Sequence, residues 1–361
     1  MHEQPNRVQD FKDTMLFQQY NCFMFRELEQ FDEELARYRA SRQGKAAIPY
    51  DDFPRHAQVN EYIESIAQRY PDIVTLVTAG NSYDGRPIKY LKISTTNFED
   101  PSKPIYFMDA MIHAREWVTT PVTLYAIHRL VEDLRNEDRD LLENIDWIIY
   151  PMVNPDGYEY SHDSERLWRR TRSTNPVDPS TCLGVDGNRN FDIAFNTVGV
   201  SSNPCSTTYP GVTPFSDVET VYIRDILHAN LDRIQLYMNI HSHGNWILYG
   251  YGFNETLPPN AAQIHHVGAT MGATIDALKL DLAPFYRVGN SAFLLYATSG
   301  SAQDYAQSIG VPFSYTLELP GYGFLFEAPP QFIGQINAET WEGIAASARL
   351  ARLYYRARIN N

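Results

Sequence analysis

Strand and helix patterns alternate along most of this chain, and this alternation restricts the fold more than any other feature. Apolar residues recur with helical spacing over approximately residues 57–70, 117–136, 217–232, 260–279 and 337–357. Strand patterns cover approximately residues 72–79, 88–94, 104–110, 145–153, 234–242 and 313–319. Such alternation predicts an α/β fold in which helices pack against a central sheet.

The first 45 residues differ from the part of the chain that follows. They carry many charges and one helical pattern, in which Leu28, Phe31 and Leu35 stand three or four residues apart. The pattern ends in the basic stretch RYRASRQGK. We therefore expect residues 1–45 to form a helical segment with a cleavable linker. Residues 46–361 contain no internal repeat and no low-complexity tract, so we expect them to form one domain.

The charge balance limits the class of partner. The formal net charge is −14 at pH 7, which disfavours binding to nucleic acid or to an anionic membrane surface. The longest apolar runs, such as residues 144–153, are about half as long as a membrane-spanning helix. We therefore expect a soluble protein whose partner is neither nucleic acid nor a membrane.

The cysteines bear on the cellular compartment. Cys182 and Cys205 enclose a loop rich in serine, proline and asparagine, whereas Cys22 stands alone. This arrangement indicates one disulfide and an oxidising compartment, with reduced, buried thiols as the alternative. A glycosylation sequon at Asn254 points in the same direction, whereas the N-terminal residues lack the regions of a signal peptide.

Two histidine-containing stretches suggest a metal site. In MDAMIHAREW, His113 and Glu116 stand three residues apart at the expected start of a helix, where one turn would bring their side chains together. A catalytic zinc ion takes three protein ligands and keeps one position open for water. The third ligand can come from NIHSHG, in which His241 and His243 would face the same side of a strand. The alternative for each motif is a polar surface without chemistry.

Arginine and glutamate residues supply a second set of candidates. ERLWRRTRS groups four arginines, including Arg169, around a tryptophan, and GVDGNRNFD places Asn188 beside Arg189 in a turn. In an acidic protein such guanidinium groups suit a bidentate carboxylate, with a solvated arginine cluster as the alternative. Glu318 lies in the apolar strand pattern FSYTLELP, where a buried carboxylate needs a partner or takes part in chemistry.

Taken together, these residues resemble the zinc carboxypeptidases of the pancreatic A/B type over approximately residues 49–351. The resemblance implies a single α/β domain with a mixed, twisted, eight-stranded sheet, helices on both faces, and one Zn²⁺ at the carboxyl ends of the central strands. It implies His113, Glu116 and His241 as the zinc ligands. It also implies Asp186 as the carboxylate that orients His113.

The resemblance further implies an activity and the residues that perform it. The chain would be a zinc-dependent metallocarboxypeptidase, an exopeptidase that hydrolyses the C-terminal peptide bond with a zinc-activated water. Glu318 matches the general base and acid, and Arg169 matches the residue that polarises the scissile carbonyl. The residues expected to contact substrate are Arg115, Asn188, Arg189, His243 and Tyr296.

The preference for the terminal residue is set in this family at the position of Gln303, where A-type enzymes carry an aliphatic residue and B-type enzymes an acidic one. Gln303 cannot neutralise a lysine or arginine side chain. The other aligned pocket positions are neutral: Leu248, Gly252, Leu295, Thr298 and Thr316. We therefore expect release of neutral terminal residues, aromatic or aliphatic. The loop after Glu318 is shorter than in the pancreatic enzymes.

The same resemblance gives expectations about context. Cys182 and Cys205 match a family disulfide, and residues 1–45 resemble the end of an activation segment. We therefore expect a secreted, monomeric zymogen that acts on peptide or protein C-termini after a trypsin-like protease cleaves at Arg39, Arg42 or Lys45. The alternatives are an inactive module that binds peptide C-termini and an inactive, precursor-like product.

Overall fold

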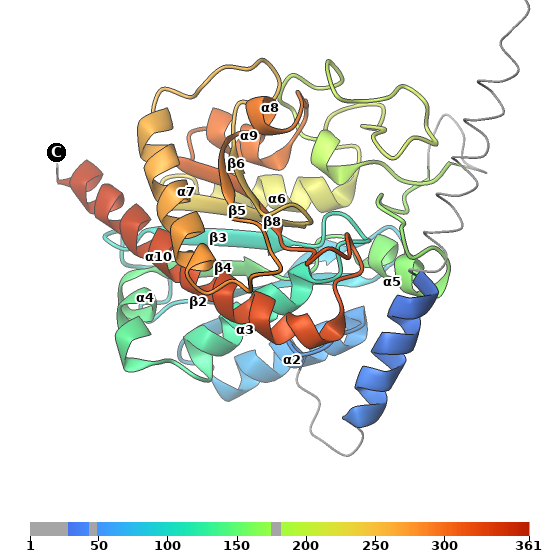
Figure 1. Ribbon diagram of the computed structural model, residues 1–361. Coiled ribbons are helices and arrows are strands. Elements are labelled where there is room, and N and C mark those ends of the chain that lie inside the picture. The colour runs from blue at the N-terminus through green and yellow to red at the C-terminus, as the bar shows by residue number, and fades with distance from the viewer. Residues whose placement is uncertain (1–27, 43–48, 175–181, 361) are drawn as a thin grey trace, which may run out of the picture.

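A mixed β-sheet of eight strands forms the centre of the molecule (Figure 1). The computed structural model describes residues 28–42, 49–174 and 182–360. The strands lie in the order β1-β2-β4-β3-β5-β8-β6-β7. Their bounds are Val74–Asn81 (β1), Pro87–Ile93 (β2), Ile105–Ala110 (β3), Asp146–Tyr150 (β4), Ile234–Ser242 (β5), Trp246–Tyr249 (β6), Arg287–Asn290 (β7) and Phe313–Leu319 (β8). The predicted α/β fold with a mixed eight-stranded sheet is confirmed.

The central strands pair in parallel. β4, β3, β5 and β8 run in one direction, whereas β2 is antiparallel to β4 and β6 is antiparallel to β8. Every residue of β3, β4 and β5 is buried, as expected for parallel strands with helices on both faces. The carboxyl ends of β3, β5 and β8 therefore meet at one edge of the sheet.

Helices cover both faces of this sheet (Figure 1). They are α2 (His56–Arg69), α3 (Thr119–Val131), α4 (Arg139–Asn144), α5 (Pro155–Asp163), α6 (Val218–Ala229), α7 (Ala261–Asp276), α8 (Ser291–Leu294), α9 (Ala302–Ser308) and α10 (Ile333–Ile359). A further helix covers residues 28–41. α2, α3, α7 and α10 share one core with Met108 and Met238, whereas α6 and α9 share the other with Phe107 and Tyr237. Neighbouring strand residues thus alternate between two cores.

The long helices and the predicted strands lie within a few residues of their expected positions. One expectation was wrong: α3 begins at Thr119, so His113 and Glu116 lie in a turn ahead of it and not on a helix. The sequence patterns also missed β6, β7, α4, α5, α8 and α9, which have between four and nine residues each. Elements this short contain too few turns or alternations for a periodic pattern.

The helix at residues 28–41 packs against the rest of the protein. The ring of Phe31 lies 6.0 Å from that of Phe53 and 5.9 Å from that of Trp117, measured between centroids. The predicted helix is therefore present, whereas Cys22 and Lys45 lie outside the described residues. The division of the chain at residue 45 stays a prediction. Among the described residues, no helix is long and apolar enough to cross a membrane.

A buried ion-pair cluster lies at the amino ends of the central strands β3, β4 and β5. Asp146, at the start of β4, is fully buried and pairs with Lys103 at 3.1 Å and with Arg233. We expect Asp146→Asn to lower the free energy of unfolding by about 3–5 kcal/mol, because the buried ammonium of Lys103 would lose its counter-charge. Urea denaturation measures this change.

The matched control is Asp225→Asn, which breaks an exposed pair with Arg224. Exposed pairs contribute about 0–1 kcal/mol, so its unfolding curve should stay close to that of the unmodified protein. If the two variants unfold at the same urea concentration, the cluster does not stabilise the fold as described.

Candidate active site

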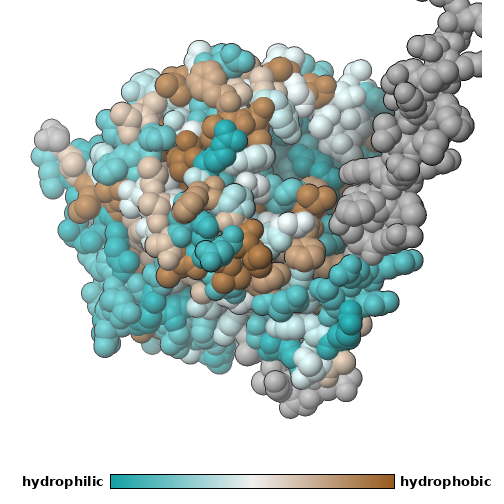
Figure 2. Space-filling view, viewed as in Figure 1, coloured by the Kyte–Doolittle hydropathy of each residue, from teal (hydrophilic) through white to brown (hydrophobic). Residues whose placement is uncertain are grey.

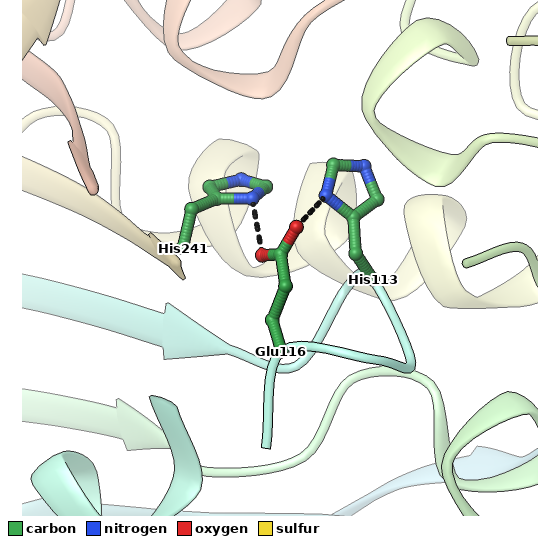
Figure 3. Close-up of side chains that lie close together, drawn as sticks. All are labelled: His113, Glu116 and His241. Carbon is green, nitrogen blue, oxygen red and sulfur yellow. Dashed lines mark hydrogen bonds and ion pairs between the residues drawn. The ribbon is translucent and has the colours of Figure 1, made fainter. Parts of the chain in front are cut away.

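Two strand ends bring the predicted zinc ligands together (Figure 3). His241 lies on β5, one residue before its end. His113 and Glu116 lie in the turn after β3, which pairs in parallel with β5. The Nδ1 atoms of His113 and His241 lie 2.8 and 2.9 Å from the two carboxylate oxygens of Glu116. All three side chains are buried.

These three residues have the composition and spacing of a zinc site. One donor atom from each lies within 4.8 Å of the other two. Two imidazole nitrogens and a carboxylate are ligands that catalytic zinc uses, and they leave one tetrahedral position for water. The turn is closed by the backbone N–H of Glu116, which donates to the carbonyl of His113 at 3.2 Å. The residues present therefore fit Zn²⁺.

Asp186 links this group to the neighbouring wall of the site. Its Oδ1 accepts from Nε2 of His113 at 2.9 Å and from the backbone N–H of Asn188 at 3.0 Å. Its Oδ2 accepts from Nε and Nη2 of Arg169 at 3.0 and 2.9 Å. Burial alone would raise the pKa of Asp186, but Arg169 and His113 outweigh it and hold this pKa well below its usual range. Because Nε2 of His113 donates, its Nδ1 keeps the lone pair that a metal needs.

A second polar chain lies behind His241 and was not predicted. Nε2 of His241 donates to the side-chain oxygen of Asn239, whose amide nitrogen donates to Asp109. The hydroxyl of Tyr237 donates to the other oxygen of Asp109 at 2.5 Å. Burial raises the pKa of Asp109 to about 6. Tyr237, Asn239 and His241 occupy every second position of β5, so the strand period could have identified them as one polar row.

Glu318 extends the site onto the next strand. It lies on β8, in register with His241 on β5. Its side chain is half-buried, and burial raises its pKa to about 7. A carboxyl group with a pKa near neutrality can both accept and return a proton.

A cleft of about 90 Å³ adjoins the predicted zinc ligands. It is lined by His113, Arg169, Asn188, Arg189, His241, Leu248, Ser291, Leu295, Tyr296, Thr298, Ser301, Gln303, Thr316 and Glu318. The structure thus gathers most of the predicted site residues around one space. Ser291 and Ser301 were not predicted, whereas Gly252 was predicted but does not belong to the lining. The lining is more polar than the sequence suggested.

Two predicted substrate contacts lie away from this lining. The guanidinium carbon of Arg115 is 4.1 Å from the ring centroid of Phe326, and the ring of His243 is 4.8 Å from the same centroid. β5 ends at Ser242, so His243 lies just beyond the strand and the strand geometry that predicted a shared side with His241 does not extend to it. Burial lowers the pKa of His243. A role in substrate binding stays a prediction for both residues.

The chain around Arg189 is held in place by several local constraints. Nε of Arg189 donates to the carbonyl of Gly199 at 3.1 Å, and Nη1 donates to that of Asn188 at 2.8 Å. Gly300 has a positive φ of 70°, and a Cβ there would lie 2.2 Å from the carbonyl oxygen of Arg189. Only glycine allows this approach.

The predicted disulfide between Cys182 and Cys205 is present.

Apolar side chains gather on the upper part of the face shown in Figure 2, whereas the lower part is mostly hydrophilic. The large exposed apolar residues include Leu282, Phe285, Phe293 and Tyr296. Tyr296 is 56% exposed and also lines the cleft. The cleft therefore carries an exposed aromatic side chain at Tyr296.

Comparison with known proteins agrees with this geometry. The zinc carboxypeptidase family model matches residues 59–343. Carboxypeptidase B of Helicoverpa zea is 49% identical over 340 residues, which cover 92% of this chain and 79% of that protein. Carboxypeptidase O of Bos taurus is 34% identical, with 87% of this chain and 85% of that protein covered.

A solved structure is also similar over most of its length. The crystal structure of the carboxypeptidase A from Helicoverpa armigera has a TM-score of 0.86 and 45% sequence identity, with 91% of this chain and 81% of that chain covered. The residues that the family model matches include the cluster of His113, Glu116 and His241. This chain therefore belongs to the zinc carboxypeptidase family, whose members use one Zn²⁺, and it is a metallocarboxypeptidase that hydrolyses C-terminal peptide bonds.

Proposed function

We propose that this metallocarboxypeptidase releases single neutral residues from peptide and protein C-termini, with Glu318 as the general base. The observation that carries the proposal is that Glu318, Arg169 and Arg189 line one cleft together with His113 and His241. Zn²⁺ held at this place supplies a Lewis acid that polarises the scissile carbonyl and lowers the pKa of water. The residues of the chain provide recognition, charge stabilisation and proton transfer.

Recognition of the free C-terminus is assigned to Arg189. Two of its nitrogens are bound to backbone carbonyls, whereas Nη2 makes no hydrogen bond to any residue that the structure describes. A guanidinium fixed in this way is preorganised for a carboxylate. An internal peptide bond has no carboxylate to offer at this position. The requirement therefore restricts cleavage to chain ends.

Stabilisation of the developing oxyanion is assigned to Arg169. Its Nε and Nη2 donate to Asp186, and its Nη1 lies 3.8 Å from a carboxylate oxygen of Glu116. The side chain is only 12% exposed. A cation that is already oriented in a partly dry site stabilises negative charge on the scissile carbonyl oxygen without reorganisation.

Proton transfer is assigned to Glu318. Its position on β8, level with His241, places it beside the metal site. With its pKa raised to about 7 by burial, the carboxylate can take a proton from the attacking water. It can then deliver that proton to the leaving amine.

The charges on the lining favour a neutral terminal side chain. Arg169 and Arg189 are engaged in the roles given above, and Glu318 is the one acidic residue of the lining. Gln303 is 3% exposed and uncharged. Asp304 follows it but lies outside the lining and accepts a backbone hydrogen bond at 2.7 Å. A terminal lysine would therefore bury an ammonium without a counter-ion, which is costly.

Secretion, a monomeric state and proteolytic activation are further parts of this proposal. The disulfide between Cys182 and Cys205 supports an oxidising compartment. Arg42, one of the predicted cleavage points, pairs with Asp51 at 2.6 Å. A trypsin-like protease would have to displace this contact to cleave there. Peptide and protein C-termini are the proposed substrates.

The role of Glu318 can be tested by Glu318→Gln. We expect this variant to retain zinc and to lose about 10²–10⁴-fold in kcat, because an amide cannot accept the proton. Peptide hydrolysis is followed by mass spectrometry before and after limited trypsin treatment. Glu255→Gln, at an exposed loop position, is the control and should keep full activity. A Glu318→Gln variant as active as the control would remove Glu318 as the base.

The ligand assignment can be tested with two histidine variants. We expect His241→Ala to lose stoichiometric zinc, because it removes one of three donors. His243→Ala should keep the metal, since its ring packs against Phe326. Metal content after dialysis is measured by atomic emission. Equal loss of zinc from both variants would show that the division of roles is wrong.

A further inference from the structure

Part of the cleft lining carries buried polar atoms that have no hydrogen-bond partner among the described residues. They include Oε1 of Gln303, Oγ1 of Thr316 and Oγ of Ser291, on side chains that are 3%, 4% and 5% exposed. All three residues line the cleft. Leaving a buried polar atom unpaired is costly, so native proteins rarely do so without a functional reason. A bound ligand that supplies the missing hydrogen bonds is such a reason.

The fold fixes these atoms relative to one another. Thr316 lies on β8, Gln303 on α9 and Ser291 at the start of α8. The hydroxyl of Ser314 on β8 donates to the backbone carbonyl of Gln303 at 2.8 Å, which ties α9 to the sheet. The side chain of Asn290 caps α8 by accepting two backbone hydrogen bonds. The side chains that carry these polar atoms therefore extend from backbone that hydrogen bonds hold in place. The atoms are thus preorganised to bind a ligand.

Gly252, which borders the lining, and two apolar lining residues give this part of the cleft its shape. A Cβ at Gly252 would lie 2.6 Å from Oγ of Ser291 and 3.1 Å from Oγ1 of Thr298, so glycine keeps the space open. Leu248 and Leu295 add apolar surface. The lining thus combines apolar walls, suited to an aliphatic stem, with polar atoms, suited to a neutral group at its end.

We propose that this pocket selects a terminal residue whose side chain ends in a carboxamide, glutamine or asparagine, over an apolar side chain of the same size. The inference rests on the proposed function, because it concerns the side chain that the C-terminal residue places in the cleft. A carboxamide both donates and accepts hydrogen bonds, as does the amide of Gln303, so the two can pair reciprocally. The hydroxyls of Ser291 and Thr316 can serve the remaining atoms as donors or acceptors.

Other terminal side chains match this lining less well. An apolar side chain would leave the polar atoms unpaired, and sites built to form hydrogen bonds reject such analogues strongly. An acidic side chain would need a cation, but Arg169 is bound to Asp186 and Arg189 is assigned to the terminal carboxylate. A basic side chain would need a carboxylate, and Glu318 is the only one on the lining.

The test uses four peptides that differ only in the last residue: glutamine, methionine, glutamate or lysine. Glutamine and methionine have similar size, so their ratio of kcat/KM isolates hydrogen bonding. We expect the glutamine peptide to exceed the methionine peptide at least about 10-fold. Equal or faster release of methionine overturns the carboxamide preference alone. No release from any peptide overturns the proposed function and this inference with it.

A pair of variants on α9 links the preference to one side chain. Gln303→Leu should reverse the preference, so that methionine is released faster than glutamine, while zinc content stays unchanged. Gln307→Leu removes a buried amide from the same helix, outside the cleft lining. It should keep the preference of the unmodified protein. A Gln303→Leu variant that binds zinc and still prefers glutamine overturns the assignment.

Discussion

The buried carboxylate of Asp186 is the constraint on which the geometry of the site depends. A buried charge is stable only when it is paired and hydrogen-bonded. Its partners are a candidate zinc ligand, His113, on one oxygen and the proposed catalytic cation, Arg169, on the other. The backbone of Asn188 adds a further donor. The bonds that make burial of this charge tolerable therefore also fix the position of Arg169 relative to the candidate metal site.

The parallel strands of the sheet also determine the geometry of the site. Because β3, β5 and β8 run in parallel, their carboxyl ends meet at one edge. His113, His241 and Glu318, which are far apart in the sequence, come together there. Helices bury both faces of these strands, so the loops at this edge are left to form the cleft. Chemistry in open α/β sheets is expected at this position.

The sequence predicted the chemistry of the site better than its local geometry. His113, Glu116 and His241 were identified by residue type and order, although a turn replaces the expected helix between the first two. Asn239 was not predicted, because the apolar residues of β5 were used to predict the strand and the polar residues at its alternate positions were not. Ser291 was missed because β7 and α8 have only four residues each. β7 is held by pairing with β6, some 40 residues earlier, and such distant pairing leaves no periodic pattern.

Recognition of the free chain end is the central claim, and one pair of substrates tests it directly. A peptide is compared with the same peptide carrying a C-terminal amide, and kcat/KM is measured for each. Removing the charged partner of a buried cation costs about 2–5 kcal/mol, so the account predicts at least about 30-fold slower hydrolysis of the amide. Equal turnover of the two forms would contradict the assignment of Arg189 and the exopeptidase mechanism built on it.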